Sequence, residues 1–459
     1  MQSIKNSNQK IPAPQKKLNA YSLAGLGIGS IIGSGFFLGC AISIQQTGPS
    51  VVLTFLLCGF LFSQVLGAMT SISINRPVTG SFKVYAEQFL GKYIGFLTGW
   101  ILFFANILTI GSEAVAAGIF LRYWLPQFPL APLSCFVILL VIAVNRLNTE
   151  DFGLVESGMA AIKIFALLFF IAAGIRFLTS QGVPAEPFPF HSPQALFPGG
   201  VTGFLQSMLV VIFTYAGVST VAMATAKVRS PQKDIPKATV VMTIGTVLLY
   251  VVTIFLIVCI IKWNSVSTSI SPLVQAFEHM GFGWASSAMN VVIVVAALSV
   301  MIGNYFGSVQ VLASLSEARE APSVFGRTTP NGFYRNAWMV TGILALLVAA
   351  VSFALSSKLF NYLISASSFF TFFNWSINLI VYWRWRNRRE KSEKFSSPLI
   401  LGKPGSCLTL VLLFLLAAAS LFVKDFRIGF YTAASISLLI SAAYLLRKRG
   451  GKESPRRPD

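Results

Sequence analysis

The sequence predicts an all-α membrane protein with twelve transmembrane helices. Of its 459 residues, 55% are hydrophobic and only 11% are charged, whereas soluble domains carry about 25% charged residues. Apolar runs of roughly 20 residues, the length that crosses a bilayer, recur along the whole chain. We place the spans at residues 20–44, 50–73, 93–121, 130–147, 153–178, 199–225, 237–262, 284–310, 336–356, 358–383, 406–423 and 428–447.

The net charge of +20 is concentrated on one side of these spans. With the N-terminus in the cytoplasm, the two tails, the loops on the cytoplasmic side and the span ends that adjoin them hold 28 of the 35 Lys and Arg residues. This asymmetry follows the positive-inside rule, so we expect a multi-pass plasma-membrane protein with both termini in the cytoplasm. The basic run 384–389 is accordingly interpreted as a topology signal, and no nucleic-acid partner is expected.

Reactive side chains are sparse in the sequence. The five cysteines lack paired spacing and the two histidines lie far apart, so we expect neither disulfides nor a metal site. The sequence contains no nucleophile motif and no cluster of His, Asp and Glu. We therefore expect no enzymatic activity, no catalytic residues and no cofactor.

The first span contains a glycine cluster, GLGIGSIIGSGFFLG, at residues 25–39. Glycine is a poor helix former, and lipid cannot satisfy unpaired backbone groups, so the cluster predicts an unwound segment, close helix packing, or both. The sixth span is weakened by small and polar residues over 213–228. Discontinuous helices at matching positions of two five-helix halves are typical of inverted-repeat transporters.

Three functions of the glycine cluster can be compared. A nucleotide-binding loop would need a preceding strand, which is absent. The GxxxG pairs Gly25/Gly29, Gly29/Gly33 and Gly35/Gly39 favour close helix packing. A break around 33–35 would instead free N–H groups for a carboxylate and carbonyls for an ammonium, the two ends of an amino acid. The last two interpretations remain open together.

Two ionisable residues lie inside predicted spans. Lys163 is ten residues inside the fifth span, where a lysine costs at least about 2.5 kcal/mol, so it should face a polar interior. Glu113 lies within the third span and is a functional candidate by the same reasoning, with a structural ion pair as the alternative.

Residues 28–36, IGSIIGSGF, resemble the first-helix signature of the amino acid–polyamine–organocation (APC) superfamily. Further matches to its amino acid permease branch are Gly48–Ser50, Pro77–Phe82 with Tyr85, Gly95–Trp100, Glu113 with Ala117, Tyr123–Pro126, Ile162–Ile164, Ser230–Pro231 and Ile235–Ala238. The similarity covers residues 18 to about 390. It implies a LeuT-type fold, with ten helices in a 5+5 inverted repeat and two further C-terminal helices.

The resemblance also divides the chain. We expect a cytoplasmic tail at 1–17, a ten-helix inverted-repeat transport core at 18–383 and a basic cytoplasmic loop at 384–405. Helices eleven and twelve then occupy 406–447, and a cytoplasmic tail occupies 448–459. Between the second and third spans, residues 75–92 mix aromatic and charged residues at helical spacing, which predicts a short helix at the membrane surface.

By position, the resemblance implies that the substrate carboxylate meets the backbone of Gly33, Ser34 and Gly35. The amine would meet carbonyls near Ile31 and in the sixth-helix turn formed by Phe213, Tyr215 and Ala216, where Phe213 matches an aromatic gate. Lys163 matches the lysine whose ammonium takes the place of Na⁺ in sodium-independent members, and Glu113 matches the acidic position of the third helix.

Three positions depart from the family pattern. Ser219 and Lys227 stand where members commonly carry Glu, and Gln310 stands where they commonly carry Arg. Loss of the two Glu residues leaves the pathway poor in negative charge, so we expect a neutral substrate, with an anionic one as the alternative, rather than lysine or arginine. The implied function is a secondary active transporter that moves a neutral L-amino acid by alternating access, without sodium and with proton coupling or exchange. A non-transporting amino acid sensor on the same fold is the alternative.

Overall fold

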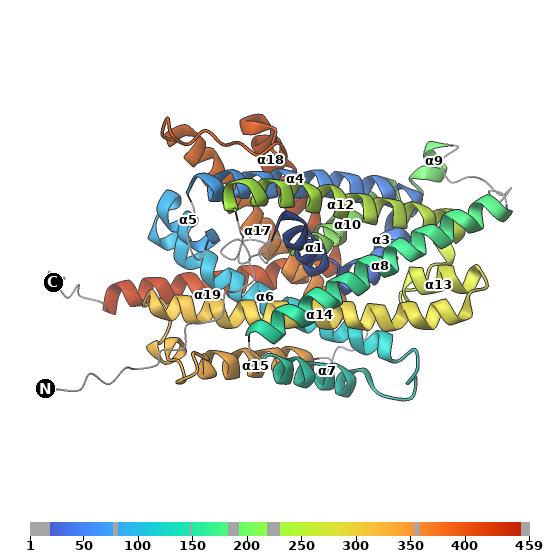
Figure 1. The fold of residues 1–459 in the computed structure, drawn as a ribbon, viewed down its shortest axis with the longest axis horizontal. Helices are drawn as coiled ribbons and strands as arrows, with labels where there is room; N and C mark the ends of the chain where they lie inside the picture. The colour runs from blue at the N-terminus through green and yellow to red at the C-terminus, as the bar shows by residue number, and fades with distance from the viewer. Residues whose placement is uncertain are drawn as a thin grey trace, which may run out of the picture.

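The computed structural model describes residues 19–76, 81–146, 149–181, 192–217, 230–351, 353 and 359–450. Every regular element within these ranges is helical, and the long helices run roughly along the longest axis of the molecule (Figure 1). The first half comprises α1 (Ala20–Ile31), α2 (Ser34–Phe37), α3 (Gly39–Thr47), α4 (Val51–Asn75), α5 (Ser81–Leu90), α6 (Lys92–Leu121), α7 (Leu130–Val144) and α8 (Thr149–Gln181).

The second half begins with a one-turn helix, α9. Its elements are α9 (Pro193–Leu196), α10 (Gly200–Thr214), α12 (Pro231–Ile260), α13 (Pro272–His279), α14 (Gly283–Glu317), α15 (Arg335–Ala350), α17 (Leu359–Arg388), α18 (Gly402–Ser420) and α19 (Lys424–Gly450). The expected short helix between the second and third spans is α5. The one-turn α9 and the short α13 were not anticipated from the sequence.

Nine helical segments among the described residues are long and apolar enough to cross a membrane. Three shorter apolar helices, Ala20–Ile31, Leu130–Val144 and Arg335–Ala350, accompany them. The all-helical membrane architecture is thus confirmed. The count of twelve crossings remains a prediction, because at 1.5 Å per residue α7 and α15 rise only about 22–24 Å against a hydrocarbon thickness of about 30 Å.

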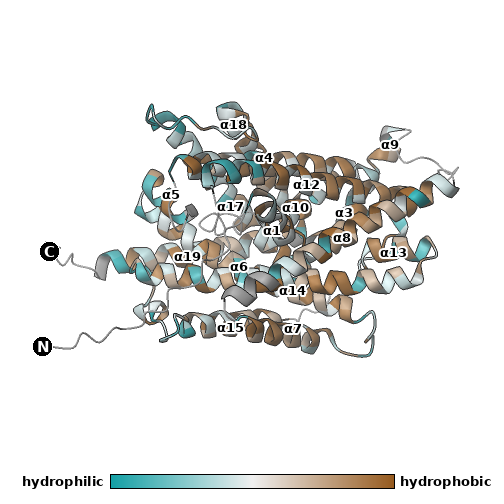
Figure 2. Cartoon of the chain, in the orientation of Figure 1, coloured by the Kyte–Doolittle hydropathy of each residue, from teal (hydrophilic) through white to brown (hydrophobic). Residues whose placement is uncertain are grey.

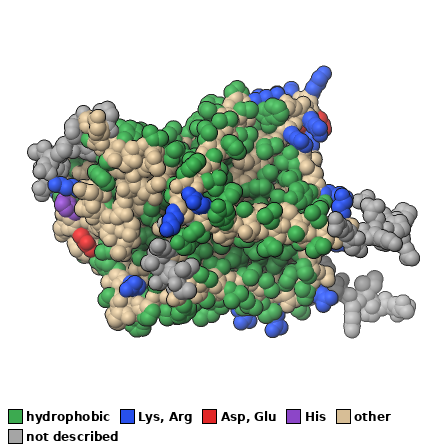
Figure 3. Space-filling model, turned by 180° about the vertical axis from the view of Figure 1, so that it is seen from behind, with side chains coloured by type: hydrophobic (Ala, Val, Ile, Leu, Met, Phe, Trp, Pro, Cys, Tyr) green, Lys and Arg blue, Asp and Glu red, His purple; other side chains and the backbone are tan. Residues whose placement is uncertain are grey.

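The outer surface of the bundle is apolar in its middle and polar at its ends. Hydrophobic residues dominate the central part of the long helices (Figure 2), and hydrophobic side chains cover most of the face seen in Figure 3. Large apolar side chains such as Phe165 and Phe414 are more than 70% exposed. In a chain that crosses the bilayer repeatedly, these side chains face lipid, which is as apolar as they are.

The first predicted span is broken. Asn19 caps α1 by accepting a hydrogen bond from the N–H of Ser22, and α1 ends at Ile31. Ile32 and Gly33 are extended, and helix resumes at Ser34, continuing through α2 and α3 to Thr47. In the sixth span, α10 ends at Thr214 and residues 215–217 form a turn. The next described residue is Ser230.

The glycine cluster serves close packing at some positions and the break at others. A Cβ on Gly29 would collide with Ala160 of α8, and one on Gly39 would lie 3.2 Å from Val210 of α10. A Cβ on Gly33 would lie 2.8 Å from both Glu113 Oε1 and Val300. Gly25 has open space around it. The two interpretations that the sequence left open therefore apply to different glycines.

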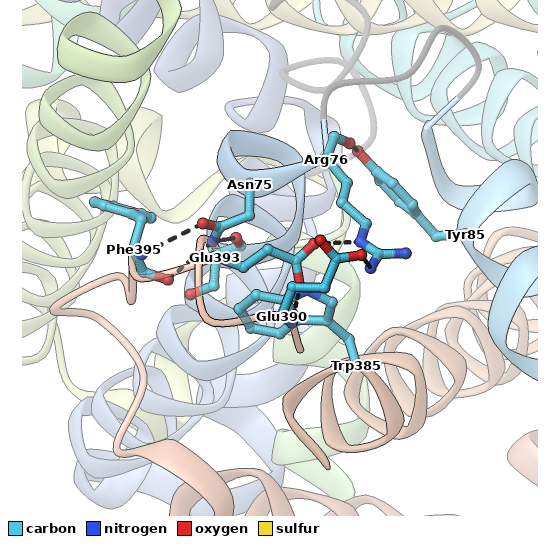
Figure 4. Close-up of polar contacts among 8 residues, drawn as sticks. Asn75, Arg76, Tyr85, Trp385, Glu390, Glu393 and Phe395 are labelled. Carbon is cyan, nitrogen blue, oxygen red and sulfur yellow. Dashed lines mark hydrogen bonds and ion pairs between the residues drawn. The ribbon is translucent and has the colours of Figure 1, made fainter. Parts of the chain in front are cut away.

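Residues 389–401, here called the strap, connect α17 to α18 and lie against one end of α4 (Figure 4). The side chain of Gln64 binds the backbone of Leu399 and Leu401, each over 2.9 Å. Nearer the end of α4, Arg76 forms an ion pair with Glu393 of the strap. The strap thus fixes α17 and α18 to α4 at the end of the molecule that also holds α5 (Figure 1).

Candidate functional site

A cavity of about 80 Å³ lies at the break in the first span. Its lining includes Ile31, Gly33 and Gly35, together with Phe213 at the end of α10 and Ala216 in the turn that follows. Side chains of α6, α14 and α17 complete it. One water needs about 10–15 Å³ by the same measure, so the cavity has room for a small molecule.

Glu113 of α6 lies at the start of the second half of the broken helix. Its Oε2 accepts a hydrogen bond from the backbone N–H of Ser34 over 2.9 Å, and only 2% of the residue is exposed. The first N–H groups of a helix lack partners within the helix and carry partial positive charge, which favours an anion. The protein's own carboxylate therefore occupies the position that the sequence assigned to a substrate carboxylate.

Lys163 of α8 lies at the other side of the break. Its Nζ donates to the carbonyl of Gly29, to the carbonyl of Ile32 over 3.1 Å and to Ser299 Oγ over 3.0 Å. The side chain is fully buried. A cation is favoured at a helix C-terminus, where carbonyls lack partners. The two charges thus complement the two helix ends that the break creates.

Tyr250 of α12 links the end of α1 to the end of α10. Its hydroxyl lies 3.3 Å from the carbonyl oxygen of Ile31 and 3.4 Å from that of Thr214, so it can donate to either. Its ring stacks on Phe36, with centroids 4.0 Å apart. A Cβ on Gly217 would lie only 2.9 Å from the carbonyl of Ser30. The end of α1 and the end of α10 therefore pack directly together.

The structure brings most of the predicted site residues to this place. Ile31, Gly33, Gly35, Phe213, Ala216 and Glu113 line the cavity. Ser34 is fully buried, with its N–H bound to Glu113, and Lys163 lies behind the break. Tyr215 is not among the cavity residues, and its hydroxyl donates to the carbonyl of Phe55 in α4. Ser219 and Lys227 lie outside the described residues, and Gln310 is half-buried on α14.

Sequence reasoning missed the polar side chains that line the rest of the cavity. The spacing of Asn106, Thr109 and Glu113 places them on one face of α6, as does that of Ser367, Thr371, Asn374 and Asn378 on α17. Polar residues recurring every three or four positions in an apolar span could have indicated this. Among the described residues, no group of three His, Cys, Asp or Glu side chains could hold a metal ion.

Comparison with known proteins places this chain in a family. The family model described as amino acid permease matches residues 24–453. The amino-acid permease AapA of Bacillus subtilis (strain 168) is 29% identical over 436 residues, which cover 93% of each chain. The gamma-aminobutyric acid permease of the same organism is 26% identical over 448 residues, 96% of each chain.

A solved structure shares the fold. It is a manganese transporter of Eremococcus coleocola, in complex with an aromatic bis-isothiourea substituted compound, with a TM-score of 0.62, 14% identity and coverage of 93% of each chain. At this identity the likeness concerns the fold alone. The family model extends over nearly the whole sequence and describes transporters rather than enzymes, so this chain belongs to the amino acid permease family.

Proposed function

We propose that this permease carries a neutral L-amino acid across the plasma membrane by alternating access, without sodium. The observation that carries the proposal is the meeting of the broken first span and the end of α10 at one cavity, with N–H groups from the first and carbonyls from both. A zwitterion can satisfy both kinds of group at once. Paired broken helices at the midplane are the expected site of a transporter built from a 5+5 inverted repeat.

In the proposed complex, the substrate carboxylate replaces Glu113 at the N–H groups of Gly33, Ser34 and Gly35. The ammonium approaches the carbonyl of Ile31 and the turn of Phe213, Tyr215 and Ala216. Support comes from the bond between Glu113 and Ser34, because it demonstrates that this helix start accepts a carboxylate. Phe213, 5% exposed at the cavity wall, is placed to close over the substrate as a gate.

Independence from sodium follows from the position of Lys163. Its ammonium is surrounded by two carbonyl oxygens and one hydroxyl oxygen, which are the donor types that a bound Na⁺ would need. Because the Lys163 ammonium already provides the positive charge at this position, no Na⁺ is needed to provide it. The proposal predicts that uptake is unchanged when choline replaces Na⁺; loss of uptake in choline would exclude it.

Coupling is assigned to Glu113. Two carboxylates at one helix start repel each other. The arriving substrate therefore favours one of two events: Glu113 takes up a proton, or the Glu113 side chain moves away from Ser34. Proton uptake would give symport, and withdrawal without a proton would give exchange. Ser219, where family members commonly carry Glu, supplies no carboxylate, which leaves this task to Glu113.

The proposed topology places both termini in the cytoplasm, with the tails at 1–17 and 448–459 and the basic loop at 384–405 on that side. The core at 18–383 carries the site, and the final pair of helices at 406–447 flanks it. Modification of single cysteines introduced into the tails, from the outside of intact cells, tests this arrangement: labelling without permeabilisation would contradict it.

The decisive experiment is uptake by the purified protein in proteoliposomes, against all twenty amino acids, with and without a pH gradient. The proposal expects uptake of one or more neutral amino acids, and competition dominated by lysine or arginine would contradict it. Counterflow separates transport from the alternative, an amino acid sensor on the same fold, because a sensor would bind its ligand without flux.

A further inference from the structure

The lining of the cavity extends away from the break along α6 and α17, and this part of the cavity is here called the shaft. On α6 its wall runs back from Glu113 to Leu102, and on α17 it runs from Ser367 forward to Asn378. Thr109 and Ser367, both in this lining, contact each other, with their hydroxyl oxygens 3.1 Å apart. Each wall spans twelve residues, a rise of about 16 Å along the helix at 1.5 Å per residue.

Four carboxamide side chains line this shaft: Asn106 from α6, Asn304 from α14, and Asn374 and Asn378 from α17. We call them the carboxamide set. Asn304 and Asn378 each donate one N–H to a carbonyl of their own helix over 2.8 Å. The side chains of Asn106 and Asn374 form no hydrogen bond with any described residue, and Asn106 is only 8% exposed. Asn374 is half-buried. Carboxamides that line a cavity and lack a partner on the protein are free to pair with a ligand that enters it.

The charge of the shaft narrows the class of that ligand. Of the described residues that line the cavity, Glu113 is the one charged side chain, and it lies at the break. A cationic or anionic group in the shaft would lose its hydration without gaining a counter-charge. An aliphatic group would leave the carboxamides unpaired. An uncharged group with both donors and acceptors matches the carboxamide set.

We propose that the carboxamide set is the side-chain subsite of this permease and that it selects amino acids with a carboxamide side chain, glutamine above all. The inference rests on the proposed function, which places the substrate's carboxylate and amine at the break. Asn106 lies seven residues from Glu113, about 10 Å along α6. The longer side chain of glutamine reaches further toward Asn106 than that of asparagine, serine or threonine.

The proposal has a chemical consequence for selectivity. Sites that hydrogen-bond a substrate group reject analogues that lack it far more strongly than apolar pockets reject small differences in size. Methionine and leucine have side chains of similar size to glutamine but cannot pair with carboxamides. The permease should therefore prefer glutamine over both, although all three are neutral.

The test measures kcat/KM for radiolabelled glutamine and leucine with the full-length protein in proteoliposomes. We expect the wild type to prefer glutamine, and Asn106→Leu to lower the glutamine-to-leucine ratio about tenfold or more, because one buried hydrogen-bonding pair is lost. Asn374→Leu should act in the same direction. Asn145→Leu is the matched control, since Asn145 bonds its own helix at the end of α7, away from the cavity, and should leave the ratio unchanged.

A competition panel with the wild type keeps the proposal falsifiable even where a variant does not fold. Stronger competition by glutamine and asparagine than by methionine and leucine supports the subsite. Preference for leucine, or an unchanged ratio in an Asn106→Leu protein that transports, would overturn the subsite while leaving the proposed function standing. A wild type that transports no amino acid would overturn the proposed function and the subsite with it.

Discussion

The backbone N–H of Ser34 donates to the carboxylate of Glu113 over 2.9 Å, across 79 residues of sequence. This bond places an anion from α6 at the start of the helix that follows the break. The N–H of Ser34 therefore has a ligand before any substrate arrives. Any molecule that binds there through a carboxylate must compete with Glu113, which ties substrate binding to the position or protonation of one side chain.

Replacement of Glu113 by glutamine tests this competition. Glutamine keeps an acceptor for the Ser34 N–H but removes the charge and the exchangeable proton. We expect uptake at low substrate concentration to lose most of its dependence on pH, and the affinity for substrate to change by about tenfold or more, since hydrogen bonds to charged groups contribute about 1.5–3 kcal/mol. Uptake in proteoliposomes between pH 5 and 8 measures both. An unaltered pH profile in Glu113→Gln would exclude Glu113 from coupling.

The two glycines Gly33 and Gly25 offer a matched pair. Gly33→Ala places a Cβ 2.8 Å from Glu113 Oε1 and from Val300, an overpacking that costs about 1–3 kcal/mol. Gly25→Ala meets nothing within 4 Å inside α1 and should gain up to about 1 kcal/mol of helix stability. Thermal unfolding in detergent and the KM for uptake should distinguish the two variants. Only Gly33→Ala should lose stability and apparent affinity for substrate. Equal behaviour of the two variants would contradict a specific role for Gly33.

Tyr250→Phe removes one hydroxyl and keeps the ring that stacks on Phe36. The carbonyls of Ile31 and Thr214 then lose a shared donor. A net hydrogen bond is worth about 0.5–1.5 kcal/mol, so we expect uptake to fall by up to about tenfold, with little change in the melting temperature. Comparison of uptake with thermal unfolding checks this. A large fall in melting temperature would assign Tyr250 to stability alone.

Protonation of Glu393 in acid should weaken the attachment of the strap to α4. Burial alone would raise the pKa of this carboxyl, but hydrogen bonds from Arg76, the Glu390 N–H and Trp385 outweigh burial and hold the pKa below its ordinary value. A depressed pKa in the folded state gives stability that is present above the unfolded pKa of about 4.5 and is lost as the pH falls through the folded value.

We therefore expect Glu393→Gln to lower stability at pH 7 by about 1–3 kcal/mol and to weaken the dependence on acid below pH 5. Glu390→Gln is the control, because Glu390 is 71% exposed and lies 3.5 Å from the same arginine. Thermal unfolding from pH 7 to pH 4 provides the measurement. If the two variants melt alike at pH 7, the buried ion pair does not hold the strap.

The sequence by itself determined the membrane class, the family and the place of the break. Composition determines whether a chain folds in water or in a lipid bilayer. A glycine cluster at membrane depth indicates where a transmembrane helix is broken. Burial of Lys163 and Glu113 could likewise be inferred, because a charged side chain deep in an apolar span has no water-exposed surface to occupy. All of these are local properties of the chain.

Only the tertiary structure decided which groups meet. Lys163 reaches the carbonyl of Ile32 across 131 residues, and Tyr250 reaches that of Ile31 across 219. The carboxamide set comes from three helices. Such contacts depend on how helices pack and rotate about their axes, and a hydropathy pattern leaves this undefined when most faces of a helix are apolar. The sequence could therefore locate the broken helix, but the charges that complement its two ends became visible only in the packed bundle.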